Sequence, residues 1–206
     1  MITRKKHLEI ALQRIPRHPS PKAELEQYAT PASIAADVLW NAYSLGDIYG
    51  KKVVDLGCGT GIFAIGAALL GARESVGVDI DPDATVVAEV QAREMEVSST
   101  RFISTDVRYF AENADTVIQN PPFGAQKAHR KEADRIFLAR ALEIAPVVYS
   151  FHVAETERFV ESFVESIGAS VTHRFYYKFQ ILHTYEFHTK EKMEVDVVVV
   201  RIEKQR

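Results

Sequence analysis

Residues 120–124 read Asn-Pro-Pro-Phe-Gly and directly follow an apolar run at 115–119 that is typical of a strand. Neither Pro121 nor Pro122 has a backbone N–H to donate, so a central strand cannot continue through them. An ordinary turn would more often use Gly, Asp or Ser at these positions. We therefore expect a rigid segment that presents the amide of Asn120 and the ring of Phe123 to a ligand.

A glycine-rich turn follows a second strand pattern. Gly57, Gly59 and Gly61 lie between a β-branched run at 51–57 and an apolar helix pattern at 62–71. Glycine allows a tight turn and lets a ligand approach bare main chain. The N–H groups at the start of the following helix favour an anionic group. This arrangement predicts a nucleotide-binding loop.

Carboxylates stand at the ends of three successive strand patterns. Asp79 has the spacing of the acid that accepts hydrogen bonds from ribose hydroxyls in nucleotide-binding folds. Asp106 can accept a hydrogen bond from the exocyclic amine of adenine, although it equally fits a helix N-cap or a turn. Asp55 suits the ammonium group of S-adenosylmethionine (SAM) and would be awkward beside a diphosphate. Together these acids favour SAM as the cofactor.

A dehydrogenase stays open on the glycine loop alone, because Gly59–Ala64 also fits the looser G-x-G-x-x-A dinucleotide motif. The Asn-Pro-Pro-Phe segment has no role in hydride transfer, which favours SAM over NAD(P). The single cysteine, Cys58, has no visible His partner, so we expect a buried side chain without a catalytic role. No Cys/His cluster predicts a metal site, so no metal is expected.

Strand and helix patterns alternate along the chain, which predicts an α/β fold with a mostly parallel sheet. The connection between the last two strand patterns is too short for a helical crossover, so the final strand should run antiparallel in a seven-stranded sheet. The strand patterns cover 51–57, 75–80, 101–106, 115–120, 146–153, 170–182 and 194–203, and the helix patterns cover 32–45, 62–71, 83–96, 131–145 and 155–168.

Length and composition fit one ordinary domain. The chain has 206 residues and a net charge of −3, so any nucleic-acid surface must be local. No apolar run is long enough to span a bilayer, and the first residues show helical spacing in place of a signal peptide. We expect a cytoplasmic protein with an N-terminal helix and arm at 1–31, followed by the main domain at 32–206.

Two motifs together resemble the amino-methyltransferase branch of class I SAM-dependent methyltransferases. These are DLGCGTG at 55–61 and NPPF at 120–123, where the branch carries (D/N)-P-P-(Y/F/W) after its fourth strand. LEQYATP at 25–31 and GVDID at 77–81 are similar to the adenine N6-methyltransferases of small-subunit ribosomal RNA and their archaeal relatives. The resemblance covers residues 24–204 and implies a Rossmann-like class I methyltransferase fold that binds SAM.

The resemblance implies a role for each residue of the NPPF segment. The side-chain carbonyl of Asn120 and the backbone carbonyl of Pro121 would each accept one N–H of an exocyclic amine. Pro122 would keep the segment rigid, and Phe123 would stack on the base. No strong base is required for this chemistry.

The resemblance also implies that part of the N-terminal arm closes over SAM and the base. The arm residues concerned are Gln27, Tyr28 and Thr30. The remaining implied cofactor contacts are Asp55, Gly57, Gly59, Gly61, Asp79, Ile80, Asp106, Val107 and Asn120.

Basic residues directly after the NPPF segment predict contacts to RNA phosphates, namely Lys127, His129, Arg130 and Lys131. The resemblance further implies a small zinc-binding activator protein that adds a strand to the sheet edge. The strand pattern at 101–106 would form that edge, and we expect an exposed apolar strip there.

These observations favour methyl transfer to the N6 amine of an adenosine in small-subunit ribosomal RNA. Guanine N2 in RNA and the amide of a glutamine in a protein stay open, because both are planar NH₂ groups. A non-catalytic partner subunit with the same fold is disfavoured, because both motifs are intact.

Overall fold

The computed structural model describes residues 2–22, 25–122, 130–182 and 192–205. The helices are α1 (Lys5–Leu12), α2 (Ala32–Ser44), α3 (Ile62–Leu69), α4 (Pro82–Glu94), α5 (Arg130–Ile144) and α6 (Glu157–Ser166), with short 3₁₀ turns η2 (Val107–Tyr109) and η3 (Ala154–Thr156). The strands are β1 (Lys52–Leu56), β2 (Glu74–Asp79), β3 (Thr100–Ser104), β4 (Thr116–Gln119), β5 (Val147–Val153), β6 (Ala169–Leu182) and β7 (Lys192–Lys204).

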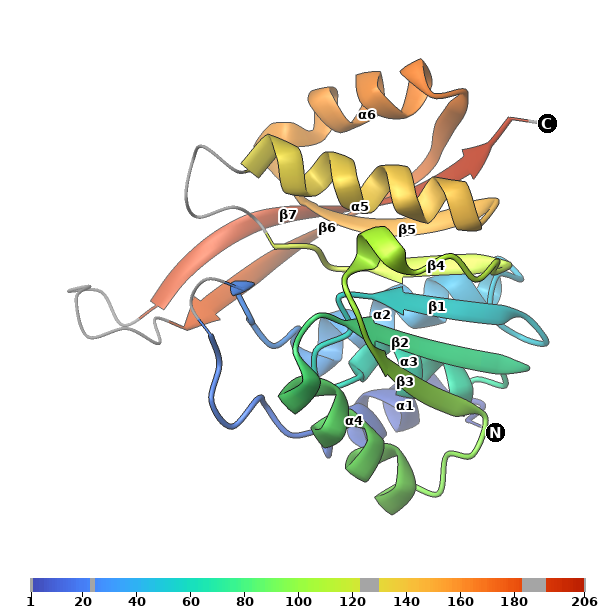
Figure 1. The fold of residues 1–206 in the computed structure, drawn as a ribbon, viewed down its shortest axis with the longest axis vertical. Coiled ribbons are helices and arrows are strands. Elements are labelled where there is room, and N and C mark those ends of the chain that lie inside the picture. The colour runs from blue at the N-terminus through green and yellow to red at the C-terminus, as the bar shows by residue number, and fades with distance from the viewer. Residues whose placement is uncertain (1, 23–24, 123–129, 183–191, 206) are drawn as a thin grey trace.

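The strands form one seven-stranded sheet in the order β3-β2-β1-β4-β5-β7-β6 (Figure 1). Strands β1 to β5 pair in parallel, and β7 runs antiparallel to both β5 and β6. This topology confirms the predicted α/β fold with its antiparallel last strand. Each predicted element also lies within two residues of its observed bounds.

Helices cover both faces of the sheet. On one face, α1, α2 and α3 share a core with Val53, Ile118 and Phe151 from the strands. On the other face, α5 and α6 pack over Val54, Val117 and neighbouring strand residues. Helix α1 belongs to the first core, because its Leu8 and Leu12 are almost fully buried. The chain therefore has one core layer on each side of the sheet.

Local sequence signals set the helix ends. Helix α4 begins after Asp81, whose side chain accepts a hydrogen bond from the Asp83 N–H, with Pro82 at the first helical position. Gly71 and Gly168 follow α3 and α6 with φ values of +89° and +74°, the left-handed conformation that glycine adopts after a helix.

A buried ion pair fixes the loop before β1 to the far side of the sheet. Arg201 of β7 donates from Nε to Asp47 Oδ2 over 2.8 Å, and Tyr149 of β5 donates its hydroxyl to the same oxygen over 2.6 Å. Both charged side chains are at most 10% exposed. The pair joins segments 154 positions apart and lies at the end of the sheet where β1 begins.

Candidate active site

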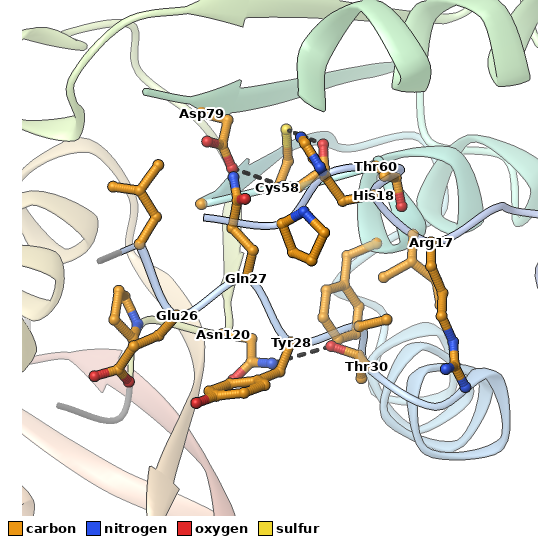
Figure 2. Close-up of a pocket in the computed structure, with 18 of the residues that line it drawn as sticks. Arg17, His18, Glu26, Gln27, Tyr28, Thr30, Cys58, Thr60, Asp79 and Asn120 are labelled. Atoms are coloured by element: carbon orange, nitrogen blue, oxygen red, sulfur yellow. Dashed lines mark hydrogen bonds between the residues drawn. The ribbon is translucent and has the colours of Figure 1, made fainter. Parts of the chain in front are cut away.

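A cavity of about 1320 Å³ opens at the carboxyl ends of β1, β2 and β4 (Figure 2). Its walls come from the glycine loop, from the residues that follow β2, β3 and β4, from α5, and from the N-terminal arm, residues 13–31. Parallel strands bring their carboxyl ends to one sheet edge, which is where open α/β sheets bind ligands. The volume exceeds the roughly 1,000 Å³ upper range of single small-molecule pockets, so it has room for a cofactor and a second reactant.

The glycine loop has the backbone conformation that the sequence predicts. Gly57, Gly59 and Gly61 have φ values of +72°, +52° and +87°. A Cβ on Gly59 would meet no atom within 4 Å, whereas one on Gly61 would lie 2.8 Å from the Phe102 ring. Gly57 and Gly59 line the cavity, and Gly61 stands at the N-terminus of α3. The loop therefore leaves open space beside Gly59.

Asp79 ties the end of β2 to the glycine loop. Its carboxylate accepts hydrogen bonds from the Gly59 N–H over 2.8 Å and from the Asp81 N–H over 2.9 Å. Burial raises the pKa of Asp79, and the two N–H donors offset only part of that effect. Each carboxylate oxygen keeps acceptor capacity, and the side chain lines the cavity. This geometry fits the predicted contact to ribose hydroxyls.

Asp55 lies beneath the glycine loop and is not among the residues that line the cavity. Its Oδ2 accepts a hydrogen bond from the Ala64 N–H over 3.0 Å, but its buried Oδ1 has no hydrogen-bond partner. Burial raises the pKa of Asp55 to about 8, and the charge of Asp79 adds to the rise. An orphaned buried carboxylate oxygen is costly and fits a cationic partner that arrives with a ligand.

The residues after β3 are brought to the cavity as predicted, but Asp106 is already engaged. Arg108 donates to the Asp106 carboxylate from its backbone N–H over 2.9 Å and from Nε over 3.0 Å. These hydrogen bonds lower the pKa of Asp106. Asp106 thus caps η2, the N-cap role that its sequence context also allowed. Val107 and the half-exposed Ile80 line the same wall.

Asn120 follows β4 and faces the arm across the cavity (Figure 2). Its Nδ2 donates a hydrogen bond to Thr30 Oγ1 over 3.0 Å. Its Oδ1 is buried and has no hydrogen-bond partner. Pro121 is buried behind it, and Pro122 lines the cavity. The site therefore holds an amide carbonyl oxygen that is desolvated and able to accept a hydrogen bond.

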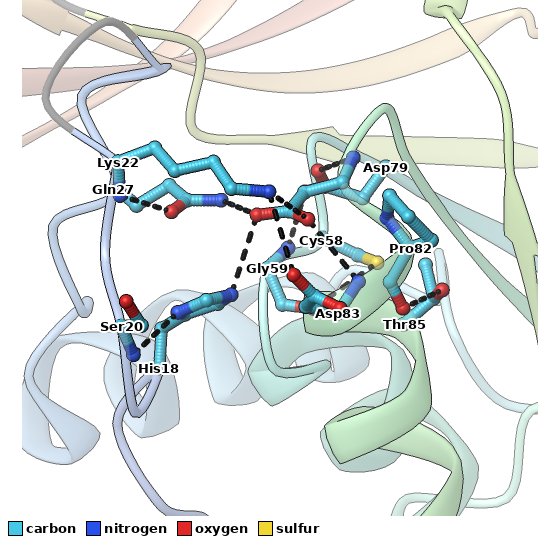
Figure 3. Close-up of polar contacts among 11 residues, drawn as sticks. His18, Ser20, Lys22, Gln27, Cys58, Gly59, Asp79, Pro82, Asp83 and Thr85 are labelled. Atoms are coloured by element: carbon cyan, nitrogen blue, oxygen red, sulfur yellow. Dashed lines mark hydrogen bonds and ion pairs between the residues drawn. The ribbon is translucent and has the colours of Figure 1, made fainter.

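The arm residues Gln27, Tyr28 and Thr30 all line the cavity, as predicted. The arm is fastened by an unpredicted residue, Asp81. Its buried carboxylate accepts hydrogen bonds from Gln27 Nε2 over 2.7 Å and from Lys22 Nζ over 2.8 Å (Figure 3). His18 Nε2 lies 3.3 Å from the same carboxylate.

Burial alone would raise the pKa of Asp81, but the hydrogen bonds from Lys22 and Gln27 outweigh it and lower the pKa. The arm is therefore held by a charged carboxylate that also caps α4. The N-cap position of Asp81 was readable from Pro82 and the helix pattern, but nothing in the sequence pairs it with residues more than 50 positions away.

Several predicted site residues lie outside what the structure describes. Phe123, Lys127 and His129 belong to the undescribed segment 123–129. Arg130 and Lys131 begin α5, but only their backbone is described. Their proposed contacts to a base and to phosphates therefore stay predictions.

The predicted apolar strip on β3 is not what the structure shows. The exposed residues of β3 are Arg101 and Ser104, and Arg101 pairs with Glu74 and Glu112 over 2.9 and 2.6 Å. The apolar side chains of β3 turn inward because Phe102 packs against Gly61 and Gly77. Across the described residues, no helix is both long and apolar enough to cross a bilayer.

Comparison with known proteins identifies methyltransferases. Residues 41–121 match the family model for ribosomal protein L11 methyltransferase (PrmA), a match that covers the glycine loop and ends in the NPPF segment. The chain is 34% identical to the rRNA N(6)-adenosine-methyltransferase METTL5 of Danio rerio, over 95% of this chain and 97% of the relative.

Archaeal proteins are more similar still. An uncharacterized protein of Methanocaldococcus jannaschii is 44% identical over 98% of this chain and 94% of its own length. The crystal structure of a proposed RNA methyltransferase from Pyrococcus horikoshii superposes with a TM-score of 0.90 at 45% identity, covering all of both chains.

Proposed function

The chain belongs to the METTL5 family of rRNA N(6)-adenosine methyltransferases, and from this membership and the cavity we propose that it methylates the N6 amine of an adenosine in ribosomal RNA with SAM as the cofactor. The observation that carries the proposal is the Asn120 side chain, whose buried Oδ1 has no partner in the cavity wall. The arm residues that face it match the family along nearly the whole chain and not only in the glycine loop.

The residues present fit SAM. Asp79 keeps acceptor capacity for two ribose hydroxyls, and Gly59 leaves room against the main chain. The orphaned Oδ1 of Asp55 fits the charge of the methionine ammonium, either directly or through a water molecule. Ile80 and Val107 supply apolar surface for the adenine ring. When bound, SAM supplies the methyl group.

The protein's own residues act on the second reactant. An exocyclic amine is a weak nucleophile, because its lone pair is delocalised into the ring. In this proposal Asn120 Oδ1 and the backbone carbonyl of Pro121 accept the two N–H groups and support the amine as it becomes pyramidal. The prolines fix the backbone, so both acceptors are preorganised. The proton leaves to water after the transfer.

The base must reach the cavity unpaired or flipped out of its helix, because the acceptors are recessed in the wall. Phe123 would stack on it, and Lys127, His129, Arg130 and Lys131 would contact phosphates near the opening. We place the target in the small subunit on the motif resemblance. Work on ribosomal RNA supports a cytoplasmic location.

A strand-adding zinc-binding activator stays part of the proposal. Strand β3 lies at the sheet edge, so its outer backbone groups have no strand partner among the described residues. Ion pairs of Arg101 mark this edge in place of an apolar strip, so we expect a partner with complementary charge.

The proposal is tested by incubating the protein with radiolabelled SAM and unmodified ribosomal RNA and then separating the nucleosides. Label in N6-methyladenosine that is lost in Asn120→Ala and kept in Asn113→Ala would support it, because Asn113 is exposed and lies before β4. Label in a guanosine derivative would overturn the base. Label only in ribosomal protein would overturn RNA as the substrate.

A further inference from the structure

The side-chain amide of Asn120 has two chemically different ends, and only one of them suits the reaction. Oδ1 accepts hydrogen bonds, whereas Nδ2 donates two. A nucleophilic amine must donate its N–H groups to the protein, so an amide turned the wrong way would set donor against donor. Some other group must therefore favour the productive orientation.

We propose that Thr30 is a positioning residue whose hydroxyl holds the Asn120 amide with Oδ1 toward the reacting amine. This inference rests on the proposed function and adds to it a role for the arm in the chemical step.

The geometry at Asn120 carries this inference. Nδ2 lies 3.0 Å from Thr30 Oγ1, across 90 positions of the chain, and Oδ1 is left buried without a hydrogen-bond partner (Figure 2). Thr30 is only 9% exposed, so its hydroxyl is held in place among protein atoms. Whenever Oδ1 faces a substrate amine, Nδ2 needs an acceptor on the other side, and the Thr30 oxygen provides it.

Thr30 sits between two fixed points. Pro31 follows it with φ of −57° and precedes the first turn of α2, where its carbonyl accepts the Ala35 N–H. A residue before proline is restricted to extended conformations, so the Thr30 backbone has little freedom. Three positions upstream, Gln27 is bound to Asp81. The arm thus presents the Thr30 hydroxyl at a defined place only when it is closed over the cavity.

The experiment compares Thr30→Val with Thr30→Ser. Valine has nearly the same shape as threonine but cannot accept a hydrogen bond, whereas serine keeps the hydroxyl. We expect Thr30→Val to lower kcat about fivefold or more, the ordinary net effect of one hydrogen bond, while the Kd for SAM changes less than twofold. We expect Thr30→Ser to restore most of kcat. Thermal unfolding checks that both variants fold.

A second background isolates the orientation effect. The amino-methyltransferase branch accepts Asp in place of the Asn of this motif, and a carboxylate has no wrong end. In the Asn120→Asp background, Thr30→Val should therefore cost less than about twofold in kcat. A penalty as large as in the wild-type background would show that Thr30 acts independently of Asn120 and would overturn the inference.

Further outcomes separate this inference from the proposed function. An active wild type with an unchanged kcat in Thr30→Val overturns the inference alone, and so does a rise in the SAM Kd that accounts for the whole loss. A wild type that does not methylate RNA overturns the proposed function. In that case the Asn120 side-chain NH₂ signals in ¹⁵N NMR still report the contact. They should shift in Thr30→Val and not in Thr30→Ser, and unchanged signals would overturn the contact itself.

Discussion

Gln27 donates a hydrogen bond from Nε2 to Asp81 Oδ2 over 2.7 Å, so the residue that caps α4 also fastens the N-terminal arm. Lys22 and His18 contact the same buried carboxylate. Asp81 lies two positions after Asp79, the predicted ribose acid, and accepts its fastening from a segment that covers the opposite wall of the cavity. Cofactor affinity should therefore depend on a residue that does not line the cavity.

Asp81→Asn tests this dependence. Asparagine keeps the N-cap but loses the charge and one acceptor, so the contacts to Lys22 and Gln27 cannot both persist. We expect the Kd for SAM to rise about tenfold, in line with the loss of a charge-assisted hydrogen bond, with little change in thermal stability. Isothermal calorimetry measures the Kd. Asp83→Asn is the matched control, because Asp83 is exposed and only 3.5 Å from Lys22. Equal affinities for both variants and the wild type would show that arm fastening does not assist SAM binding.

The raised pKa of Asp55 predicts a pH dependence of stability. Its pKa in the folded protein is about 8, against an ordinary value of 3.8, so the folded state holds a proton that the unfolded state releases. The free energy of unfolding should therefore fall as the pH rises from about 4 to about 8. Asp79 contributes in the same direction.

Asp55→Asn should flatten this decline, because asparagine cannot ionise. Urea unfolding at pH 5, 7 and 9 measures it in the absence of SAM. The variant should gain stability relative to the wild type as the pH rises. A wild type that is most stable at pH 8 to 9, with the variant parallel to it, would show that Asp55 is ionised in the folded protein.

The buried pair of Asp47 and Arg201 should dominate stability without affecting binding. Arg201→Met leaves the Asp47 carboxylate buried with only Tyr149 and backbone contacts near it, which should cost about 3–5 kcal/mol of unfolding free energy. Lys204→Met, at an exposed position of the same strand, should change it by less than about 0.5 kcal/mol. Chemical denaturation gives both values. The Kd for SAM should stay unchanged, since the pair lies at the opposite end of the strands. A cost below about 1 kcal/mol would contradict the assignment.

Two glycines of the cofactor loop should respond differently to alanine. Gly61→Ala places a methyl group 2.8 Å from the Phe102 ring at a φ of +87°, so we expect a loss of about 2–4 kcal/mol. Gly59→Ala meets no neighbour and should cost only the backbone strain, about 1 kcal/mol. Phe102→Leu, which shortens the side chain, should recover part of the Gly61→Ala loss in thermal unfolding. Additive losses in the double variant would argue against the clash.

The fold could be predicted because its signals are local. β-branched runs, helical periodicity and glycines after α3 and α6 each depend on a few neighbouring residues. The positions of Asp79 and Asn120 at strand ends followed from the same patterns, since parallel strands bring their carboxyl ends together. The order of the strands in the sheet required the structure.

The contacts that complete the site could not be predicted in this way. Asn120 meets Thr30 across 90 positions, and Asp81 meets Lys22 across 59. Such side-chain pairs leave no periodic trace in a single sequence. Asp106 shows a further limit, because the same residue type suits both an adenine contact and the cap that Arg108 completes. Burial of Asp55 likewise depends on how the whole loop packs above it.

The placement of β7 between β5 and β6 has a consequence for biosynthesis. Every described residue that lines the cavity lies before position 138, yet the sheet is complete only once residues 192–204 have joined its interior. Until then β5 has an open edge and Asp47 lacks Arg201. A growing chain on the ribosome therefore carries all the described cavity residues before it can close its sheet, and such late, long-range pairing makes the last step of folding slow.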